Sequence, residues 1–579
     1  MFKAVESHAD VHLVCYQGTD AAGPVWVGSA GQALGGAREV STSELSPTAA
    51  EPLYRDEVLE IEPHGLEHIV LGERHGKPFQ LFTLWMAANL VLATWVVGNI
   101  AVGVFGESML GAFAGLAIGT ILGAVLLGLL STFGPRLGVP QLVQSRGAFG
   151  LLGNFGPGAL NYLPGIGWFA VNTVYGTFAL SQLIHLPYFG SLAIMVVGQV
   201  VLAVYGYNMI HVFERWMSVA LGIVFLILAV FTFSHGNYGL PFNPKAPVPY
   251  GGEMGGFILT VGLGLSYVMG WMPYASDYSR YLARETRSSA IIWWSALGIA
   301  IPCVLLEWMG ALTVSIPMPA ADALNPANAI AFLMPGPLAG LALLAIATGT
   351  ACANALNIYS GAMSALVIRV DRAPWARAGV TGLIFAAASA LILSTANSTL
   401  VSEKQAPLAG GLVLAAAVVV GAVVMVAVRF RMKRWQAAIL VGVLGGLLSI
   451  GGSDPVVAAS QYTNFLLLLS YWISPWVAVV LIDWYFKHRG AYQLRVLYDQ
   501  QSTMRAGAIA WLVGLAASVP FMNQSWYVGV VPMKLPQLGD LTYFVGFIVA
   551  AVVFAIFGRP TAQGAPDAGP LASPGLSAS

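Results

Sequence analysis

Charged side chains are scarce in this chain of 579 residues: Asp, Glu, Lys and Arg make up 9%, whereas hydrophobic residues make up 57%. So little charge cannot cover a water-soluble protein of this length, and the mean hydropathy is +0.74. The composition excludes a soluble fold and predicts an all-α integral membrane protein, with the lipid bilayer as its surroundings. The formal net charge is zero, so nothing in the overall balance favours nucleic acid as a partner.

Cysteine is rarer still. Cys15, Cys303 and Cys352 are too few and too scattered for a disulfide framework or a thiolate metal site. No His or acidic cluster falls within an apolar segment, so we expect neither a metal nor a cofactor. An enzyme would need such a cluster or a nucleophile–base pair at membrane depth. A channel would need a repeated filter or a charged ring, and neither pattern occurs.

No apolar run precedes Leu81, which predicts that there is no cleavable signal peptide and that the first spanning helix is the insertion signal. We interpret residues 1–60 as a weakly ordered cytoplasmic extension, 61–557 as the transmembrane domain and 558–579 as a disordered tail.

Fourteen apolar segments of spanning or near-spanning length follow. They are 81–104, 109–130, 160–184, 189–205, 216–233, 255–274, 291–316, 338–366, 375–395, 408–428, 435–452, 465–484, 506–519 and 541–557. An even number places both termini on one side. Of the 26 Lys and Arg residues, all but Lys245, Lys404 and Lys534 fall on that side. The asymmetry predicts cytoplasmic N- and C-termini in a multi-pass protein of the cytoplasmic membrane.

The third segment carries Trp168 and Asn172 one helical turn apart, and therefore on one helix face. A flat aromatic surface beside an amide suits a planar, polar, uncharged ring. The alternative is an aromatic residue packed on a neighbouring helix and an Asn that joins two helices. An unpaired amide is costly in hydrocarbon, so Asn172 should face protein or a water-filled cavity.

The sixth segment contains Gly270 and Pro273, which weaken helical hydrogen bonding and indicate a broken helix that lines a cavity. Tyr267 and Trp271, one turn apart, are candidates for a second aromatic wall. Ordinary tight packing through small residues explains the same pattern equally well.

Polar residues also crowd the eighth segment, where Thr348, Thr350, Asn354 and Asn357 lie within ten residues. Such a concentration is costly in a membrane helix unless the groups meet a partner or a ligand, and we favour a binding role.

In the first segment, Asn89 and Thr94 give a weaker signal, because no Gly or Pro indicates a break before Gly98. Glu307 is the one acidic residue well inside a segment, which makes it a candidate proton site or a protonated structural group. Asp483 lies at a helix end beside Lys487, and we expect a structural pair there.

Six motifs are distributed along the chain: ERHG at 73–76, Trp85 with AAN at 87–89, GPRLGVPQLVQSRGAFG at 134–150, GWFAVNT at 167–173, WMPYASDYSRYL at 271–282 and NIYS at 357–360. Together they resemble the motifs of the nucleobase:cation symporter family, and most closely those of its purine/cytosine permease branch. The resemblance covers roughly residues 61–557.

This resemblance implies a leucine-transporter-like fold of two inverted five-helix repeats, with the first and sixth spans broken and two C-terminal helices added. It implies that Trp168 stacks on a nucleobase and that Asn172 bonds the edge of the ring. Trp271, or its neighbours Tyr267 and Gly270, would close the other face. Asn357 would supply a second polar contact, with Asn354 as the alternative.

Two features depart from the family pattern. The family has twelve spans, so residues 373–428 are interpreted as an inserted helical hairpin, which we expect to be peripheral and to pack against a neighbouring helix or a second protomer. The other departure concerns the coupling ion. The resemblance implies that sodium-coupled relatives bind the ion partly through hydroxyl side chains, five and six residues before their substrate-binding Asn. If that Asn is Asn357, the two positions are Ala351 and Cys352, which carry no hydroxyl. If it is Asn354, they are Thr348 and Gly349, and only Thr348 carries one. Protons are therefore favoured over sodium, with Glu307 as the carrier.

The expected function is that of a secondary active transporter that imports a nucleobase, such as cytosine or a purine, by alternating access. A related planar compound such as a hydantoin, allantoin, uracil or a vitamin ring is the alternative.

Overall fold

The computed structural model describes residues 5–7, 10–12, 68–205, 207–246, 251–318, 324–367, 382, 434–490, 493–499, 502–524 and 527–560. The predicted hairpin at 373–428 lies outside these ranges apart from residue 382, as does most of the predicted tail. The chain divides into two units, Met1–Asp56 and Glu57–Ser579. In the first unit, β1 (Val5–Ser7) pairs antiparallel with β2 (Asp10–His12), with Glu6 opposite Val11.

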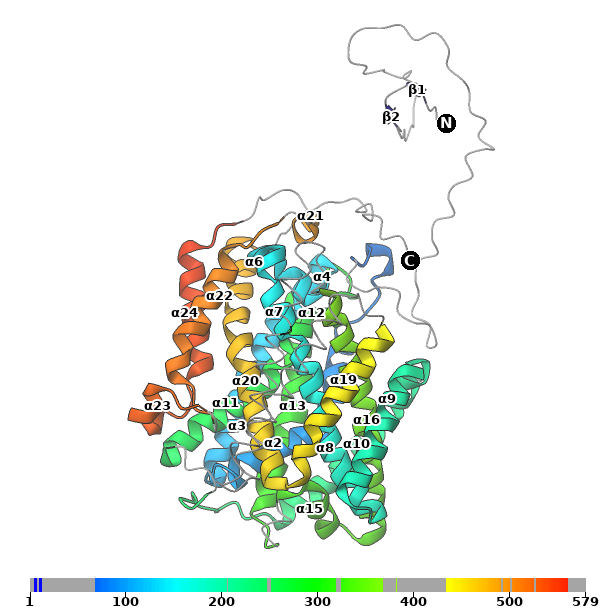
Figure 1. Ribbon diagram of the computed structural model, residues 1–579, viewed down its shortest axis with the longest axis vertical. Coiled ribbons are helices and arrows are strands. Elements are labelled where there is room, and N and C mark those ends of the chain that lie inside the picture. Colours follow the sequence, from blue (N-terminus) through cyan, green and yellow to red (C-terminus); the bar gives the residue numbers. More distant parts are fainter. Residues whose placement is uncertain are drawn as a thin grey trace, which may run out of the picture. The chain divides into compact units, whose positions relative to one another are not determined.

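The second unit is helical throughout its described part (Figure 1). Its longer helices are α1 (Phe79–Asn89), α2 (Leu92–Gly103), α3 (Met109–Ser131), α8 (Tyr162–Ile184), α9 (Tyr188–Tyr205), α10 (Tyr207–His235), α11 (Gly252–Met269), α13 (Ser288–Val314), α16 (Gly336–Val367), α19 (Arg434–Ser449), α20 (Pro455–Ile482), α22 (Ala506–Ser518) and α24 (Thr542–Phe557).

Short helices connect them. They are η1 (Leu71–Glu73), α4 (Phe133–Leu137), α5 (Gln141–Gln144), α6 (Arg146–Gly153), α7 (Phe155–Leu160), η2 (Met272–Tyr274), α12 (Ala275–Ser279), α15 (Pro326–Leu333), η3 (Ile450–Ser453), η4 (Asp483–Lys487), α21 (Leu494–Tyr498), η5 (Val519–Phe521), α23 (Val530–Lys534) and η6 (Pro536–Leu538).

Twelve of the fourteen predicted segments coincide with helices of the described part, and the other two form the predicted hairpin. By length and composition, five of the described helices can cross a membrane, or up to seven if each bent pair counts as one span. The prediction of a helical membrane protein is therefore confirmed for the described part of the second unit.

The first predicted span is broken where the sequence has neither Gly nor Pro. α1 ends at Asn89, α2 begins at Leu92, and the two axes differ by 62°. Side chains satisfy backbone groups at the break: Asn89 Nδ2 donates to Trp85 O (2.7 Å) and Thr94 Oγ1 donates to Asn89 O (2.8 Å). Asn and Thr side chains compete with helical hydrogen bonds in this way. In the sixth span, α11 ends at Met269 and is followed by η2 and α12, but Gly252–Ser279 as a whole still counts as one candidate span.

Two glycines allow the backbones of α2 and α13 to pack in direct contact. A Cβ added at Gly98 of α2 would lie 1.6 Å from the carbonyl oxygen of Glu307, and one at Gly310 of α13 would lie 1.8 Å from that of Trp95. No side chain fits either position without a backbone shift. Small residues at such crossings are typical of membrane helices, where close van der Waals contact holds helices together.

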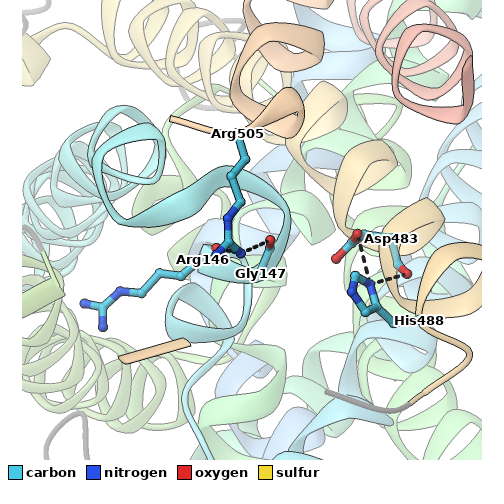
Figure 2. Close-up of polar contacts among 5 residues, drawn as sticks. All are labelled: Arg146, Gly147, Asp483, His488 and Arg505. Carbon is cyan, nitrogen blue, oxygen red and sulfur yellow. Dashed lines mark hydrogen bonds and ion pairs between the residues drawn. The ribbon is translucent and has the colours of Figure 1, made fainter. Parts of the chain in front are cut away.

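The C-terminal helices α22 and α24 contact each other and α20, and they lie along one edge of the view (Figure 1). The loop before α22 is joined to α6. Arg505 Nη1 donates to Gly147 O at 2.7 Å (Figure 2). Arg505 N donates to Phe149 O at 2.9 Å. Arg505 lies partly buried in this contact, and burial lowers its pKa.

Asp483, near the end of α20, pairs with His488 at 3.2 Å (Figure 2). The predicted partner was wrong, because Lys487 Nζ instead donates to Ala555 O at 2.7 Å. The π-helical turn Asp483–Lys487 widens the backbone there, so the residue that returns to Asp483 is five positions along rather than four.

Candidate functional site

Trp168, on α8, lies among aromatic rings from two other helices. Its ring meets Tyr267 of α11 edge to face, with centroids 5.5 Å apart, and Phe465 and Tyr462 of α20 at 5.4 and 6.0 Å. Edge-to-face contacts hold an aromatic ring in a defined orientation. The indole is 9% exposed.

Gly270 lies beside this indole. A Cβ at Gly270 would be 3.2 Å from Trp168 Cζ2 and 3.3 Å from Nε1, which is closer than ordinary van der Waals contact. Because Gly270 directly follows the end of α11, the position combines an interrupted helix with the smallest possible side chain. The predicted residues Trp168, Tyr267 and Gly270 are thus brought together.

A second group surrounds the break in the first span. Trp271 Nε1 donates to Asn89 Oδ1 (3.1 Å), and the hydroxyls of Tyr267 and Thr94 are 2.6 Å apart. Thr94 uses its single hydrogen on Asn89 O, so Tyr267 must be the donor to Thr94. The break in the first span therefore meets the end of α11 and the residues that follow it, through Asn89, Thr94, Tyr267 and Trp271.

The two candidates for the second aromatic wall occupy different places. Tyr267 contacts Trp168, whereas Trp271 packs edge to face on Trp85, with centroids 5.7 Å apart. Of the two, only Tyr267 contacts the Trp168 ring among the contacts described, whereas Trp271 is hydrogen-bonded to Asn89 at the break in the first span.

Three predicted amides form a third group between α8 and α16. Asn172 Nδ2 and Asn357 Nδ2 both donate to Asn354 Oδ1, at 3.3 and 3.0 Å. Asn354 is fully buried, Asn172 is 5% exposed and Asn357 is half-buried. Both alternatives for the family's Asn thus belong to one cluster, in which Asn354 is central and Asn357 lies nearer the edge.

Several residues of these groups escaped the sequence interpretation. Gln199 of α9 and Thr173 of α8 both bond Asn354, at 3.1 Å each. A lone Gln within the apolar segment 189–205 is a usable signal, because amides inside membrane helices seek partners. Tyr462 and Phe465 carried no such signal, since aromatic residues are common in apolar helices.

Glu307 of α13 is fully buried, and its Oε2 accepts from Thr120 Oγ1 of α3 at 2.8 Å. Among the described residues, nothing hydrogen-bonds its Oε1. Thr348 lies elsewhere: its hydroxyl donates to Leu344 O of its own helix at 2.7 Å and lies 3.7 Å from Met217 Sδ of α10. Glu307 and Thr348, the two residues predicted to bind the coupling ion, therefore have no hydrogen-bond partner in common.

The part of the chain that the structure describes holds no group of three or more His, Cys, Asp or Glu residues that could bind a metal ion. The polar side chains of the three groups are amides, hydroxyls and an indole N–H, all of them uncharged.

Residues 71–439 and 437–546 match the family model described as "Permease for cytosine/purines, uracil, thiamine, allantoin". The chain belongs to this family. The permease is 27% identical to YxlA of Bacillus subtilis, provisionally named a purine-cytosine permease, over 87% of this chain and 97% of that protein. It is 24% identical to the purine-cytosine permease fcyB of Emericella nidulans, over 85% and 87% of the two chains. The hydantoin permease of Microbacterium maritypicum is 26% identical over 35% of this chain and 41% of its own length.

The fold of the permease is similar to that of Mhp1, a nucleobase-cation-symport-1 family transporter solved in a closed conformation with bromovinylhydantoin bound. The TM-score is 0.55 at 16% identity, covering 86% of this chain and 97% of Mhp1. The resemblance to the nucleobase:cation symporter family is confirmed, and with it a multi-pass membrane transporter rather than an enzyme.

Proposed function

We propose that this permease is a secondary active transporter that imports a nucleobase, such as cytosine or a purine, across the cytoplasmic membrane by alternating access. Both termini lie on the cytoplasmic side in this proposal, as the distribution of Lys and Arg predicts. The observation that carries it is the contact of Trp168 with Gly270 and Tyr267 at the end of α11, with Asn172 of the amide cluster one helical turn along α8.

The chemistry of this site matches a flat heterocycle. Stacking of a base on an aromatic ring contributes about 1–3 kcal/mol, and Trp168 offers such a ring. Asn172 lies one helical turn from Trp168 on the same helix face, Asn357 bonds the same Asn354 as Asn172 does, and amides read donors and acceptors on the edge of a ring. Interrupted helices in transporters place unpaired backbone groups beside a substrate at mid-membrane depth.

A related planar compound is the second candidate. The family description includes uracil, thiamine and allantoin, and a hydantoin permease is among the relatives. A hydantoin or allantoin ring has the same flat shape and the same polar edges, so an aromatic surface beside amides would accept it.

Uptake of radiolabelled cytosine, adenine, guanine, uracil, allantoin and a hydantoin by a transport-deficient host separates the two candidates. Saturable uptake of cytosine or a purine, competed by the unlabelled base, supports the proposal. Uptake of allantoin or hydantoin without any nucleobase would favour the second candidate, and uptake of none would contradict both.

We also propose that protons drive transport and that Glu307 carries the coupled proton. An ionised carboxylate without a cation is costly in an apolar interior, and Glu307 is fully buried with one oxygen that accepts from no described residue. A sodium site would need several oxygen ligands. The hydroxyl of Thr348 is instead bonded to its own helix.

Initial uptake rates at fixed pH, with sodium replaced by choline and then with a protonophore added, test the coupling. We expect no change with choline and loss of uptake with the protonophore. Sodium-dependent uptake that persists after the proton gradient is collapsed would refute proton coupling.

A further inference from the structure

The hydroxyl of Thr120, on α3, is directed toward a different helix. A Thr within a helix commonly donates to the carbonyl oxygen one turn earlier. Four other buried threonines of the described helices do so at 2.7–2.9 Å, namely Thr232, Thr260, Thr313 and Thr463. Thr120 is fully buried as well, yet the acceptor that the described residues give its hydroxyl is Glu307 Oε2 of α13, at 2.8 Å. The Thr120 hydroxyl is therefore turned toward a carboxyl group and not toward its own helix.

Close helix packing holds both ends of this hydrogen bond in place. On the donor side, a Cβ added at Gly264 of α11 would lie 2.9 Å from both Leu116 O and Thr120 Oγ1, so α3 and α11 are in direct contact beside the hydroxyl. On the acceptor side, a Cβ added at Gly98 of α2 would lie 1.6 Å from Glu307 O. The donor is thus held between α3 and α11, and the acceptor between α13 and α2.

The surroundings of Glu307 supply no charged partner in the described part of the chain. α13 contacts α1, α2, α3 and α10, and α1, α2 and α3 contain no Asp, Glu, Lys, Arg or His. Among the described side chains of α10, His235 is the one titratable group, and it is exposed at the helix end. The titratable groups that interact electrostatically with Glu307 are Cys303 of α13, Tyr267 of α11 and Tyr462 of α20, which are ordinarily neutral at pH 7.

These contacts determine how a proton can bind to the carboxyl group. Burial in an apolar interior favours the neutral acid, whereas a hydrogen bond donated to a carboxylate favours its charged form. Thr120 keeps its hydrogen on Oε2, so the proton binds at Oε1, the oxygen of Glu307 that has no hydrogen-bond partner among the described residues. When that proton leaves for water, the carboxylate that remains is stabilised by the Thr120 hydroxyl.

We propose that Thr120 is a positioning residue for proton coupling, whose hydroxyl sets the pH at which Glu307 binds and releases the coupled proton. The contact allows a buried carboxyl group without a cation to alternate between its neutral and charged forms during transport. This inference rests on the proposed function, because it takes Glu307 as the carrier of the proton.

The pH dependence of uptake tests this role. Initial uptake of the transported labelled base is measured at external pH values from 5 to 9, with the internal pH held constant. Thr120→Val removes the hydroxyl and keeps the shape of the side chain, so Glu307 should hold its proton to a higher pH. The midpoint of the pH profile should rise by about one to two pH units, as expected for loss of one hydrogen bond to a charged group.

A second readout separates proton release from the other steps. Net uptake requires that the proton leaves on the inner side, whereas exchange of labelled for unlabelled base does not. In Thr120→Val, the rate of net uptake should therefore fall relative to the rate of exchange.

Two variants serve as controls. Thr120→Ser keeps the hydroxyl and should restore the wild-type midpoint. Thr313→Val removes a buried hydroxyl from the same helix as Glu307, but that hydroxyl bonds Met309 O at 2.7 Å, so the midpoint should stay unchanged. A merely structural role predicts instead that Thr120→Val and Thr313→Val both lower the maximal rate and leave the midpoint where it is. If Thr120→Val does not reach the membrane, Thr120→Ala removes the same hydroxyl and takes its place.

The outcomes separate this inference from the proposed function. If wild-type uptake does not respond to pH or to a protonophore, or if Glu307→Gln keeps the wild-type pH profile, proton coupling through Glu307 fails. If Glu307→Gln abolishes the pH dependence but Thr120→Val keeps the wild-type midpoint, the positioning role of Thr120 is overturned and coupling through Glu307 stands.

Discussion

At the scale of single residues, Trp168 has the largest expected effect on transport. Trp168→Ala should raise the KM for the imported base about 5- to 150-fold, because one stacking face worth about 1–3 kcal/mol is lost. Trp168→Phe keeps part of the surface and should fall between wild type and Ala. The measurement is initial uptake against substrate concentration, normalised to the amount of protein in the membrane. An unchanged KM in Trp168→Ala would remove this residue from the site.

His68, outside the spanning helices, gives a pH prediction. Burial, and then the charge of Arg74, lower the pKa of His68 from 6.5 to about 4, and Arg74 Nη2 donates to His68 Nε2 at 3.0 Å. Between these values the unfolded chain binds more protons than the folded one, so stability should fall as the pH drops from 6.5 to 4.

The melting temperature of the purified protein in detergent, measured at several pH values from 7 to 4, tests this. His68→Asn should flatten the fall over that range, since a neutral amide does not titrate. An equally steep fall in the variant would assign the acid sensitivity to other groups.

At the scale of elements, the contact between α2 and α13 is the least tolerant of change. Gly98→Ala places a Cβ within 1.6 Å of the Glu307 carbonyl oxygen, so the helices must separate. Overpacking of this kind costs about 1–3 kcal/mol or more. Gly340→Ala on α16 is the matched control, because an added Cβ there meets nothing within 4 Å.

In detergent, the melting temperature should be clearly lower for Gly98→Ala than for the wild type, and nearly unchanged for Gly340→Ala. Equal melting temperatures would mean that α2 and α13 can move apart at little cost.

The predicted hairpin is an element whose role can be tested by removal. Neither of its apolar segments carries an acidic residue, and its small residues suit packing on a neighbour or a second protomer. Deletion of residues 373–428 should therefore reduce folding yield or oligomerisation more than substrate affinity. Uptake and size-exclusion chromatography measure both, and a well-folded deletion with a changed substrate preference would contradict a peripheral role.

At the scale of the whole molecule, the sequence predicted the all-helical membrane fold and the positions of most described helices, because long apolar runs are local signals. It also identified Trp168, Asn172 and Asn354 as candidate substrate-binding residues. The position of the break between Asn89 and Leu92 could not be predicted from the sequence. No Gly or Pro lies there, and the backbone groups are satisfied by the side chains of Asn89 and Thr94. Gln199 was missed although a lone Gln in an apolar segment is a local signal; its partner could not be predicted, because Asn354 lies 155 residues away in the sequence.

The backbone contact between α2 and α13 also limits how transport can occur. The backbones of α2 and α13 are in direct contact at Gly98 and Gly310, so we expect the two helices to move as one rigid unit. Glu307 belongs to that unit, and so does the half of the broken first span that begins at Leu92. Any hinge at the Asn89–Leu92 break therefore carries the carboxyl group of Glu307 along with it, which links the place where a proton could reside to the element that opens and closes.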